Sequence, residues 1–450
     1  MTVRNSRTAM KQPTTTMPRS HELRSRAHAL IPGGAHTYSK GDDQFPEIAP
    51  GFLVRGKKAH VWDPDGNEYV DWGMGLRAVI LGHADPGVIK AVTTELSNGS
   101  NFIRPSPIEV EVAELLAEHI PSAEMVKFAK NGSDVTTAAV RLSRAFTGRD
   151  LIVRCADHPF YSVHDWFIGD TIVSAGIPDA IRNLTKRFRY NSVESLEAVF
   201  AEHPNQIAAV ILEAVTVEEP RPGFLQGVRD LCSREGAILI FDEIITGFRF
   251  DARGAQNYFG VTPDLSTWSK AIGNGLSVSA LCGRKDVMER GGLRHQHDRV
   301  FLLSNTFGGE THHLAALREV ATRVFAGGVI ERIWEVGRQL KSGFTDAAAA
   351  AGLGEHAKIT GYDCSPIQSF TDANGAPSPA LRTLFLQEMV RRGVLIPYIA
   401  PSAAHTDEDI RITIDAAGES FEILTKALES GTTDGLLIGE PTKPVFRQRN

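Results

Sequence analysis

The sequence predicts an α/β enzyme whose large domain holds a mainly parallel, doubly wound sheet, accompanied by a smaller α+β domain. Short apolar runs without polar alternation, such as Ala208–Leu212 and Ile238–Phe241, are typical of parallel strands buried on both faces. Helical patterns lie between such runs from about residue 65 to about residue 325. After about residue 330, a long helical pattern precedes a mixture of short strands and helices, which indicates a second domain.

These changes of pattern set the expected domain boundaries. We expect a flexible tail at 1–20, an N-terminal segment joining the small domain at 21–64, a large domain at 65–325 and a C-terminal small domain at 326–450. The tail is basic and Thr-rich but lacks the apolar run of a secretory signal.

The individual elements follow from the spacing of apolar residues. Apolar residues three and four apart predict helices at 21–30, 82–92, 108–119, 135–146, 328–350 and 379–391, and a last one ending at about 428. Strand patterns lie at 125–129, 151–153, 208–212, 238–241, 367–370 and 394–396. Between residues 51 and 70, short strands at Phe52–Val54 and His60–Trp62 are expected on either side of a turn at Gly56-Lys57-Lys58, as in an antiparallel meander.

The composition narrows the class of function. The 450 residues are 42% hydrophobic and carry a net charge of −6, so a large core is expected and a broad basic surface for nucleic acid is not. No apolar run approaches the roughly 18 residues of a membrane helix. The four cysteines are far apart and show no Cys-x-x-Cys spacing, which predicts reduced thiols in a cytoplasmic protein and no metal site.

One acid and one lysine point to chemistry. Asp242 follows a buried strand, where open α/β sheets place their ligands, and Lys270 lies in a loop of small residues that leaves an amine accessible. An enzyme that uses pyridoxal phosphate (PLP) needs this pair, because a lysine forms a Schiff base with the cofactor and an acid keeps the ring nitrogen protonated. Taken singly, Asp242 could cap the following segment and Lys270 could be a solvated surface residue.

Two further segments could complete such a site. The turn Asn131-Gly132-Ser133-Asp134 connects a predicted strand to a predicted helix, which is the geometry that binds phosphate, although an ordinary helix cap has the same pattern. The loop His158–Trp166 is rich in aromatic residues, which either stack on a flat ring or pack in the core.

Several motifs in a fixed order resemble the class III, fold-type I family of PLP-dependent aminotransferases, in the branch of glutamate-1-semialdehyde aminomutase. The resemblance runs from Ile31 to about Leu428. The matching segments are Pro32–Gly34, Trp62–Gly66, Leu81–His83, Asn131–Asp134, Phe241–Arg249, Ser269–Gly275, Asn305–Gly309 and His405–Ile410. This likeness implies a large domain with a seven-stranded, mainly parallel sheet and a small domain built from both termini.

The resemblance also implies roles for individual residues. Lys270 would form the Schiff base with PLP and carry the proton in catalysis, and Asp242 would pair with the pyridine nitrogen. The other residues implied to surround the cofactor are Gly132 and Ser133 at the phosphate, Phe160 on the ring with Tyr161 beside it, Glu213, Ile244, and Thr306 of the partner subunit in a homodimer. Glu243 is expected to be structural.

Departures from the family pattern concern the substrate. The aminomutase arginine that binds the substrate carboxylate corresponds to Lys40, which cannot make the same bidentate contact. The aminomutase glutamate after Ala-Pro-Ser has no counterpart, since Ser402 leads almost directly into His405. Arg77 and Arg104 are the substitute candidates for binding an anionic substrate, and a plain salt bridge is the alternative for each.

The main functional hypothesis is therefore an aminotransferase that moves an amino group from an amine donor to an aldehyde or ketone acceptor. A glutamate-1-semialdehyde 2,1-aminomutase is the close alternative, and a PLP-dependent racemase or decarboxylase is a third. Intact Lys270, Asp242 and Thr306 argue against a non-catalytic PLP-binding protein. A nicotinamide-dependent dehydrogenase is disfavoured because no Gly-x-Gly-x-x-Gly follows an early strand.

Overall fold

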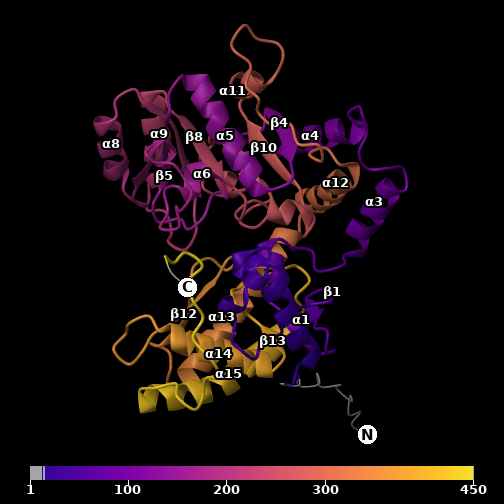
Figure 1. Cartoon of the computed structure of the whole chain (residues 1–450), viewed down its shortest axis with the longest axis vertical. Coiled ribbons are helices and arrows are strands. Elements are labelled where there is room, and N and C mark those ends of the chain that lie inside the picture. Colours follow the sequence, from indigo (N-terminus) through magenta and orange to yellow (C-terminus); the bar gives the residue numbers. More distant parts are fainter. Residues whose placement is uncertain (1–12, 14–15, 449–450) are drawn as a thin grey trace. The chain divides into compact units, whose positions relative to one another are not determined.

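The computed structural model describes residues 13 and 16–448, whose contacts divide into two compact units (Figure 1). The central unit comprises Gly75–Leu81, Asp85–Ile333 and the chain from Phe446 onward. The terminal unit comprises the chain up to Met74, Gly82–Ala84 and Trp334–Val445. The expected flexible tail at 1–20 lies mostly outside the described residues, and its last three residues begin helix α1 (Pro18–Leu30).

The central unit contains a seven-stranded sheet in the order β4-β10-β9-β8-β7-β5-β6. Its strands are β4 (Met125–Ala129), β5 (Leu151–Cys155), β6 (Thr185–Phe188), β7 (Ile207–Leu212), β8 (Ile238–Asp242), β9 (Leu265–Trp268) and β10 (Ser279–Gly283). Neighbouring strands from β9 to β6 are parallel, and β10 runs antiparallel to β4 and β9. The predicted mainly parallel sheet is confirmed. Every residue of β7 and β8 is buried, which explains their unbroken apolar sequence.

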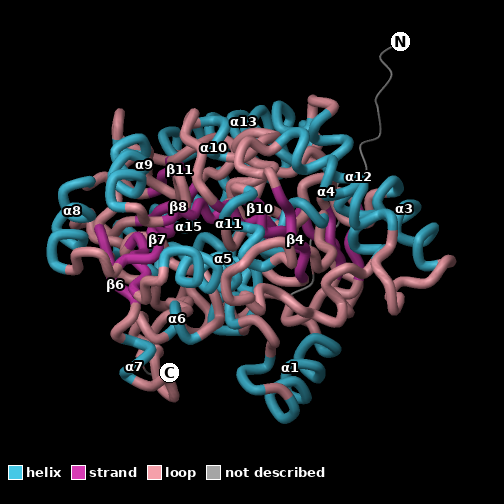
Figure 2. Tube along the Cα trace, turned by 90° about the horizontal axis from the view of Figure 1, so that it is seen from above, coloured by secondary structure: helices cyan, strands magenta, loops and turns pink. Residues whose placement is uncertain are grey.

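Helices cover both faces of this sheet. Figure 2 shows α5 (Gly132–Thr147) and α9 (Phe224–Glu235) on opposite sides of the strands. The longer remaining helices are α3 (Pro86–Leu96), α4 (Pro107–His119), α8 (Val193–Glu202) and α12 (Thr311–Phe325). The short ones are α6 (Asp165–Ile168), α7 (Asp179–Arg182), α10 (Ala255–Tyr258), α11 (Lys285–Met288), η4 (Lys270–Gly273) and η5 (Glu289–Gly291). Strands alternating with helices on both faces leave the carboxyl ends of the parallel strands at one edge, where loops form a site.

The terminal unit combines segments from both halves of the chain. Strands β1 (Arg55–Lys57), β2 (His60–Trp62) and β3 (Glu68–Asp71) form an antiparallel meander, and β13 (Val394–Leu395) pairs with β3 in parallel. The other elements are the hairpin β11 (Ala357–Thr360) and β12 (Ile367–Phe370), the helices α13 (Val329–Ala350), α14 (Pro379–Arg391) and α15 (Asp407–Ser430), and the short turns η1 (Pro32–Gly34), η2 (Tyr38–Lys40) and η3 (Asp42–Gln44).

Aromatic side chains join the three long helices of the terminal unit. The ring of Phe344 on α13 lies 5.7 Å from that of Phe385 on α14 and 5.0 Å from that of Phe421 on α15, measured between centroids. Such pairs contribute about 0.5–1.5 kcal/mol each beyond the burial of their area. This aromatic contact fixes the helices in one core together with neighbouring aliphatic residues.

The structure corrects one detail of the meander. Its first strand is Arg55–Lys57 and not Phe52–Val54, and Gly56 lies within the strand, opposite Val61, instead of in a turn. A Cβ atom at Gly56 would lie 2.7 Å from Cγ of the His83 ring. The glycine therefore marks a close approach of a side chain to the strand and not a reversal of the chain. No helix in the described part of the chain is long and apolar enough to cross a membrane.

Candidate active site

Two buried acids meet at the carboxyl ends of β7 and β8. Glu213 directly follows β7 and Asp242 is the last residue of β8, and each is only 3% exposed. The two strands are parallel neighbours, so their ends lie at the same edge of the sheet. This is the edge at which ligands bind in open α/β sheets.

Asp242 is held so that one of its oxygens remains available. Its Oδ1 accepts hydrogen bonds from the backbone N–H of Ile244 at 3.0 Å and from the hydroxyl of Thr267 at 3.1 Å. Its Oδ2 has no hydrogen-bond partner among the described residues. The carboxylate is thus oriented from β8 and β9 while one oxygen is left for a ligand.

Lys270 follows β9 and begins the short 3-10 turn η4. Its backbone has a φ of 49°, in the left-handed region that a residue with a side chain rarely adopts. The preceding residue fixes the turn, because the Ser269 hydroxyl donates to the carbonyl of Val278 at 3.0 Å. Unusual backbone conformations of this kind gather at functional sites.

The charges of these three groups depend on one another. Burial lowers the pKa of Lys270, and the positive charges of Arg77 and Arg249 lower it further against the opposing effect of both carboxylates. Burial raises the pKa of Glu213, and the negative charge of Asp242 adds to that rise. Burial also raises the pKa of Asp242. The site therefore makes the lysine amine easier to deprotonate and favours at least one protonated carboxyl group.

The turn at 131–134 forms the N-terminus of α5, and Ile244 contacts it. Asn131 caps the helix, and its backbone N–H donates to the Asp134 carboxylate at 3.1 Å. A Cβ atom at Gly132 would lie 2.6 Å from Cδ1 of Ile244, so a larger residue there would have to displace this side chain. Ser133 Oγ accepts a hydrogen bond from the N–H of Val163 at 3.0 Å. The first turn of a 16-residue helix thus presents its N–H groups close to Ile244, two residues after Asp242.

A second contact fastens this turn to the start of α12. The Lys130 ammonium lies 2.6 Å from Oε2 of Glu310 and also contacts Nδ1 of His313. Asn305 donates to the Asp134 carboxylate at 3.3 Å. These contacts hold the loop that carries Thr306, whose side chain is exposed in the single chain.

In the aromatic loop, Phe160 and Tyr161 have opposite environments. Phe160 is 44% exposed, whereas Tyr161 is 1% exposed, with its hydroxyl 2.9 Å from Nδ1 of His158. The same Nδ1 accepts the backbone N–H of Glu213 at 3.2 Å, and burial lowers the pKa of His158 to about 4, so the ring is neutral. Phe160 is available to a ligand, while His158 and Tyr161 support the segment after β7. Nothing in the spacing of the sequence predicts this role of His158.

The substrate candidates have different surroundings. Met74–Arg77, labelled α2, form a left-handed turn in which Leu76 and Arg77 have φ values of 62° and 69°. This turn places the charge of Arg77 near Glu213 and Lys270, close enough to alter the pKa of each. Arg104 is exposed, with no described ion pair or hydrogen bond to these groups, and Lys40 is exposed on η2 of the terminal unit.

Glu243 has a structural role. Its carboxylate accepts the backbone N–H groups of Ala255 at 2.9 Å and Gln256 at 2.8 Å, and it also contacts the Thr246 hydroxyl. Glu243 therefore fixes the start of α10, and both of its oxygens are used by hydrogen bonds within the chain. Asp242 and Glu243 are adjacent in sequence, but only Asp242 retains a free oxygen.

The residues present fit PLP. Among the described residues, the amine of Lys270, the carboxyl group of Glu213 and Oδ2 of Asp242 have no hydrogen-bond partner, although Glu213 and Asp242 are almost fully buried and Lys270 is half-buried. A buried polar atom without a partner is costly unless a ligand satisfies it. A helix N-terminus for a phosphate and an exposed aromatic ring for stacking complete the requirements of this cofactor.

Comparisons with known proteins agree with this geometry. The aminotransferase class-III family model matches residues 40–428. The chain is 35% identical over 438 residues to a glutamate-1-semialdehyde 2,1-aminomutase of Syntrophobacter fumaroxidans, covering 90% of this chain and 98% of the relative.

Two solved structures share the fold over nearly the whole chain. The PLP internal aldimine form of the FumI protein from Sphingopyxis sp. MTA144 superimposes with a TM-score of 0.84 at 28% identity, covering 92% of this chain and 98% of that one. An omega-transaminase from Sphaerobacter thermophilus gives a TM-score of 0.79 at 26% identity, covering 90% of this chain and 97% of that one. The chain therefore belongs to the class III aminotransferases, in the glutamate-1-semialdehyde aminomutase-like branch, and is a fold-type I enzyme whose cofactor is PLP.

Proposed function

We propose that this enzyme is a two-substrate transaminase in which Arg77 binds the carboxylate of its amine or carbonyl substrate. The observation that carries this proposal is the position of Arg77, whose charge lies among the groups that surround Lys270. A guanidinium in a buried site matches a carboxylate with two parallel hydrogen bonds. The amine donor would be an amino acid, and the acceptor an aldehyde or a keto acid.

The bound cofactor would supply an aldehyde carbon that takes up an amine. Its ring would withdraw electrons from the substrate carbon that bears this amine. Lys270 holds and returns the proton at that carbon, which requires an amine that is neutral for part of the cycle. Asp242 holds the proton of the ring nitrogen through its free Oδ2. The burial that lowers the pKa of Lys270 excludes water from the same place.

The remaining cofactor residues would bind and orient. The N–H of Gly132 and the hydroxyl of Ser133 would bind the phosphate, together with Thr306 of the partner subunit. Phe160 would stack on one face of the ring, with Ile244 packed against the other. Glu213 and Tyr161 would close the inner wall.

The segment after Ala400-Pro401-Ser402 supports transamination over internal amine transfer. His405 is 1% exposed and stacks on Trp72, with 4.0 Å between the ring centroids. The next residue, Thr406, caps α15. No acid occupies the place where the resemblance expects the aminomutase glutamate.

The experiment that tests the proposal supplies amino donors and carbonyl acceptors separately. Purified enzyme with an amino acid alone should convert the cofactor to its amine form once, and an added keto acid should restore the original absorbance. Multiple turnovers should require both substrates. Loss of all activity in the Lys270→Ala variant is expected, and unchanged activity there would refute the assignment of Lys270.

A glutamate-1-semialdehyde 2,1-aminomutase is the second candidate, because the Syntrophobacter relative bears that name at 35% identity. Incubation with glutamate-1-semialdehyde and no added donor separates the two. Sustained formation of 5-aminolevulinate would support the aminomutase, and absence of turnover would support the transaminase. Chiral analysis of the recovered amino acid tests for a racemase in the same experiment.

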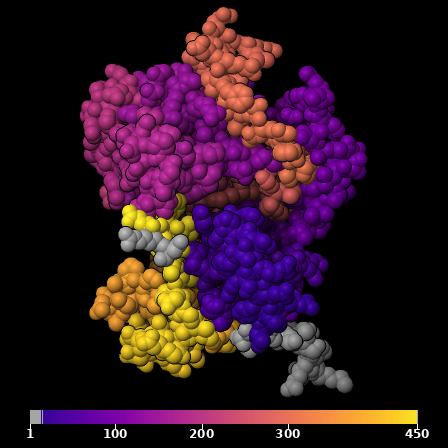
Figure 3. All heavy atoms as spheres, in the orientation of Figure 1, coloured from indigo at the N-terminus to yellow at the C-terminus, as the bar shows by residue number. Residues whose placement is uncertain are grey.

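We also propose a homodimer in the cytoplasm. Several large apolar side chains are exposed in the central unit, among them Phe102, Ile103, Leu293, Phe301 and Phe307. Some of them belong to the orange segment around residue 300 that stands out from the surface of this unit in Figure 3. Exposed apolar surface of this extent is typical of subunit interfaces. The four cysteines are buried and form no disulfide in the described part of the chain, which is compatible with a reducing compartment.

A further inference from the structure

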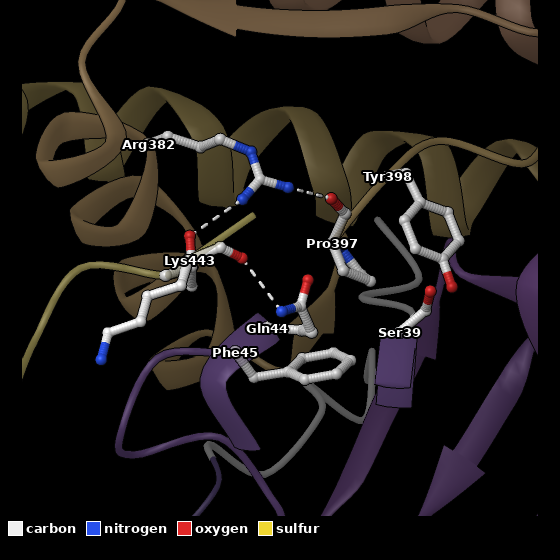
Figure 4. Close-up of a pocket in the computed structure, with 8 residues that line it drawn as sticks. Ser39, Gln44, Phe45, Arg382, Pro397, Tyr398 and Lys443 are labelled. Carbon is white, nitrogen blue, oxygen red and sulfur yellow. Dashed lines mark hydrogen bonds between the residues drawn. The ribbon is translucent and has the colours of Figure 1, made fainter. Parts of the chain in front are cut away.

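A separate cavity lies within the terminal unit. It has a volume of about 180 Å³ and is lined by Ser39, Gln44, Phe45, Arg382, Pro397, Tyr398, Thr442 and Lys443. Figure 4 shows Arg382 reaching from its helix to one wall, with the Phe45 ring and Tyr398 on other sides. An apolar cavity of about 150 Å³ holds benzene, so this one is large enough for a small organic molecule.

Arg382 is the only cation whose charged group faces this cavity among the lining residues. It stands in the first turn of α14, and its guanidinium donates to the carbonyl of Pro397 at 2.6 Å and to the hydroxyl of Thr442 at 3.2 Å. Figure 4 shows the ammonium of Lys443 pointing away, so this residue contributes its backbone to the wall.

No described carboxylate pairs with Arg382. Both of its hydrogen-bond partners among the described residues are neutral oxygens, and burial alone lowers its pKa, with no acid acting in the opposite direction. The two arginines at the opposite end of α14 differ, since Arg391 and Arg392 both pair with Glu388, at 3.3 and 2.8 Å. A partly buried cation is ordinarily compensated by an anion. At Arg382 the described chain forms a cavity beside the guanidinium but provides no anionic group to compensate its charge.

Two ends of the chain close the same space. Gln44 donates to the carbonyl of Lys443 at 3.0 Å, and the N–H of Lys443 donates to the carbonyl of Asp43 at 2.9 Å. The C-terminal segment is also joined to α14, because the N–H of Thr442 donates to the Thr383 hydroxyl at 2.9 Å. These hydrogen bonds hold the walls in place without using the remaining N–H groups of Arg382.

We propose that this cavity binds a small organic carboxylate, with its carboxylate on Arg382 and a flat body between Phe45 and Tyr398. An arginine guanidinium has five N–H donors. In the described structure, Nη1 and Nη2 of Arg382 each donate one hydrogen bond, so other N–H groups remain for a ligand. A planar carboxylate matches the remaining donors better than a spherical ion. The site lies wholly within the terminal unit and uses neither Lys270 nor Arg77.

Benzoate is the probe, because it combines a carboxylate with a ring of the size that the cavity accepts. Titration calorimetry on the Arg77→Gln holoenzyme, which lacks the carboxylate contact proposed for the active site, should still give one saturable site per chain. The variant Arg382→Gln should weaken binding roughly tenfold or more, the effect of one charge-assisted hydrogen bond. The matched variant Arg391→Gln removes a charge from the same helix outside the cavity, and its benzoate affinity should equal that of the parent.

A second variant distinguishes loss of the binding site from loss of folding stability in Arg382→Gln. Ser39 has no described hydrogen bond of its side chain, so Ser39→Phe should fill the cavity, abolish benzoate binding and leave the melting temperature unchanged. Equal binding in Arg382→Gln, no binding to the parent enzyme, or loss of binding only in Arg77→Gln would each overturn the proposal. Binding of inorganic phosphate without benzoate would overturn the carboxylate assignment. None of these results depends on whether the enzyme is a transaminase.

Discussion

Arg249 donates a hydrogen bond from Nη2 to the backbone carbonyl of Arg77 at 3.3 Å, from a position that is fully buried. The accepting carbonyl belongs to a left-handed turn, a conformation that the surrounding structure must support. Arg249 is also one of the positive charges that lower the pKa of Lys270. One side chain thus supports the conformation of the substrate candidate and favours the deprotonated form of the candidate catalytic amine.

The first prediction concerns the charge of Arg249. Its replacement in Arg249→Gln removes a positive charge near Lys270, so the pKa of the lysine rises and a smaller fraction of the amine is neutral at pH 7. The pH dependence of cofactor uptake by the cofactor-free enzyme, followed by absorbance, should shift to higher pH because uptake needs the neutral amine.

Arg249→Lys separates charge from geometry. It keeps the charge but loses the planar fork, so the pH profile should remain in place while binding of carboxylate substrates weakens. Arg253→Gln is the control, because its guanidinium donates to the carbonyl of His119 from an exposed position. An equal shift in Arg253→Gln and Arg249→Gln would show that the effect is general and not local.

The second prediction concerns substrate choice. Arg77→Gln should lower kcat/KM for amino acid donors by roughly tenfold to a hundredfold, the loss of one or two charge-assisted hydrogen bonds. An uncharged amine donor should lose less than an amino acid donor, because it makes no such contact and is affected only through the higher pKa of Lys270 in the variant. Arg104→Gln should leave both rates unchanged. A loss confined to Arg104→Gln would move the carboxylate site to that residue.

Local pattern predicted most of the longer helices and the strands with unbroken apolar runs, but not the order of the strands in the sheet. The apolar runs of β7 and β8 predicted buried strands. The structure adds that these strands are parallel neighbours, so that Glu213 and Asp242 lie at one edge. Strands β6, β9 and β10 were not predicted, because Thr-Lys-Arg-Phe, Leu-Ser-Thr-Trp and Ser-Ala-Leu-Cys-Gly lack an unbroken apolar run.

Contacts between distant residues lay beyond the sequence pattern. The hydrogen bond from Arg249 to Arg77 joins residues 172 positions apart, and the one from Glu213 to His158 joins residues 55 apart. Arg249 stands in an apolar motif, and this could have indicated its burial. The cavity at Arg382 has no sequence signal, because its walls come from both ends of the chain.

The third prediction concerns the fit of Gly132 against Ile244. A Cβ atom in Gly132→Ala would lie 2.6 Å from Cδ1 of Ile244, and the displaced side chain would disturb the floor proposed for the cofactor ring. We expect roughly tenfold weaker PLP binding, an overpacking cost of about 1–2 kcal/mol, measured by fluorescence quenching of the cofactor-free enzyme.

The partner variant tests the cause. In Gly132→Ala combined with Ile244→Ala, the clash is removed and part of the affinity should return, as a double-mutant cycle would report. Gly418→Ala is the control, because a Cβ atom there meets nothing within 4 Å and the residue lies within α15. Absence of any recovery in the double variant would mean that Gly132 acts through its backbone alone.

The last prediction concerns the sharing of sites between subunits. Thr306 is exposed in the single chain and has no described contact with Lys270, as expected if it serves the partner's cofactor. We expect Lys270→Ala to be inactive and Thr306→Val to bind PLP weakly. If the two variants are mixed, unfolded and refolded together, each mixed dimer combines the intact Lys270 of one chain with Thr306 of the partner subunit. Random pairing restores about a quarter of the sites, with parental PLP affinity. Without this recovery, Thr306 would act within its own chain, because a residue that serves its own site cannot be supplied by another copy.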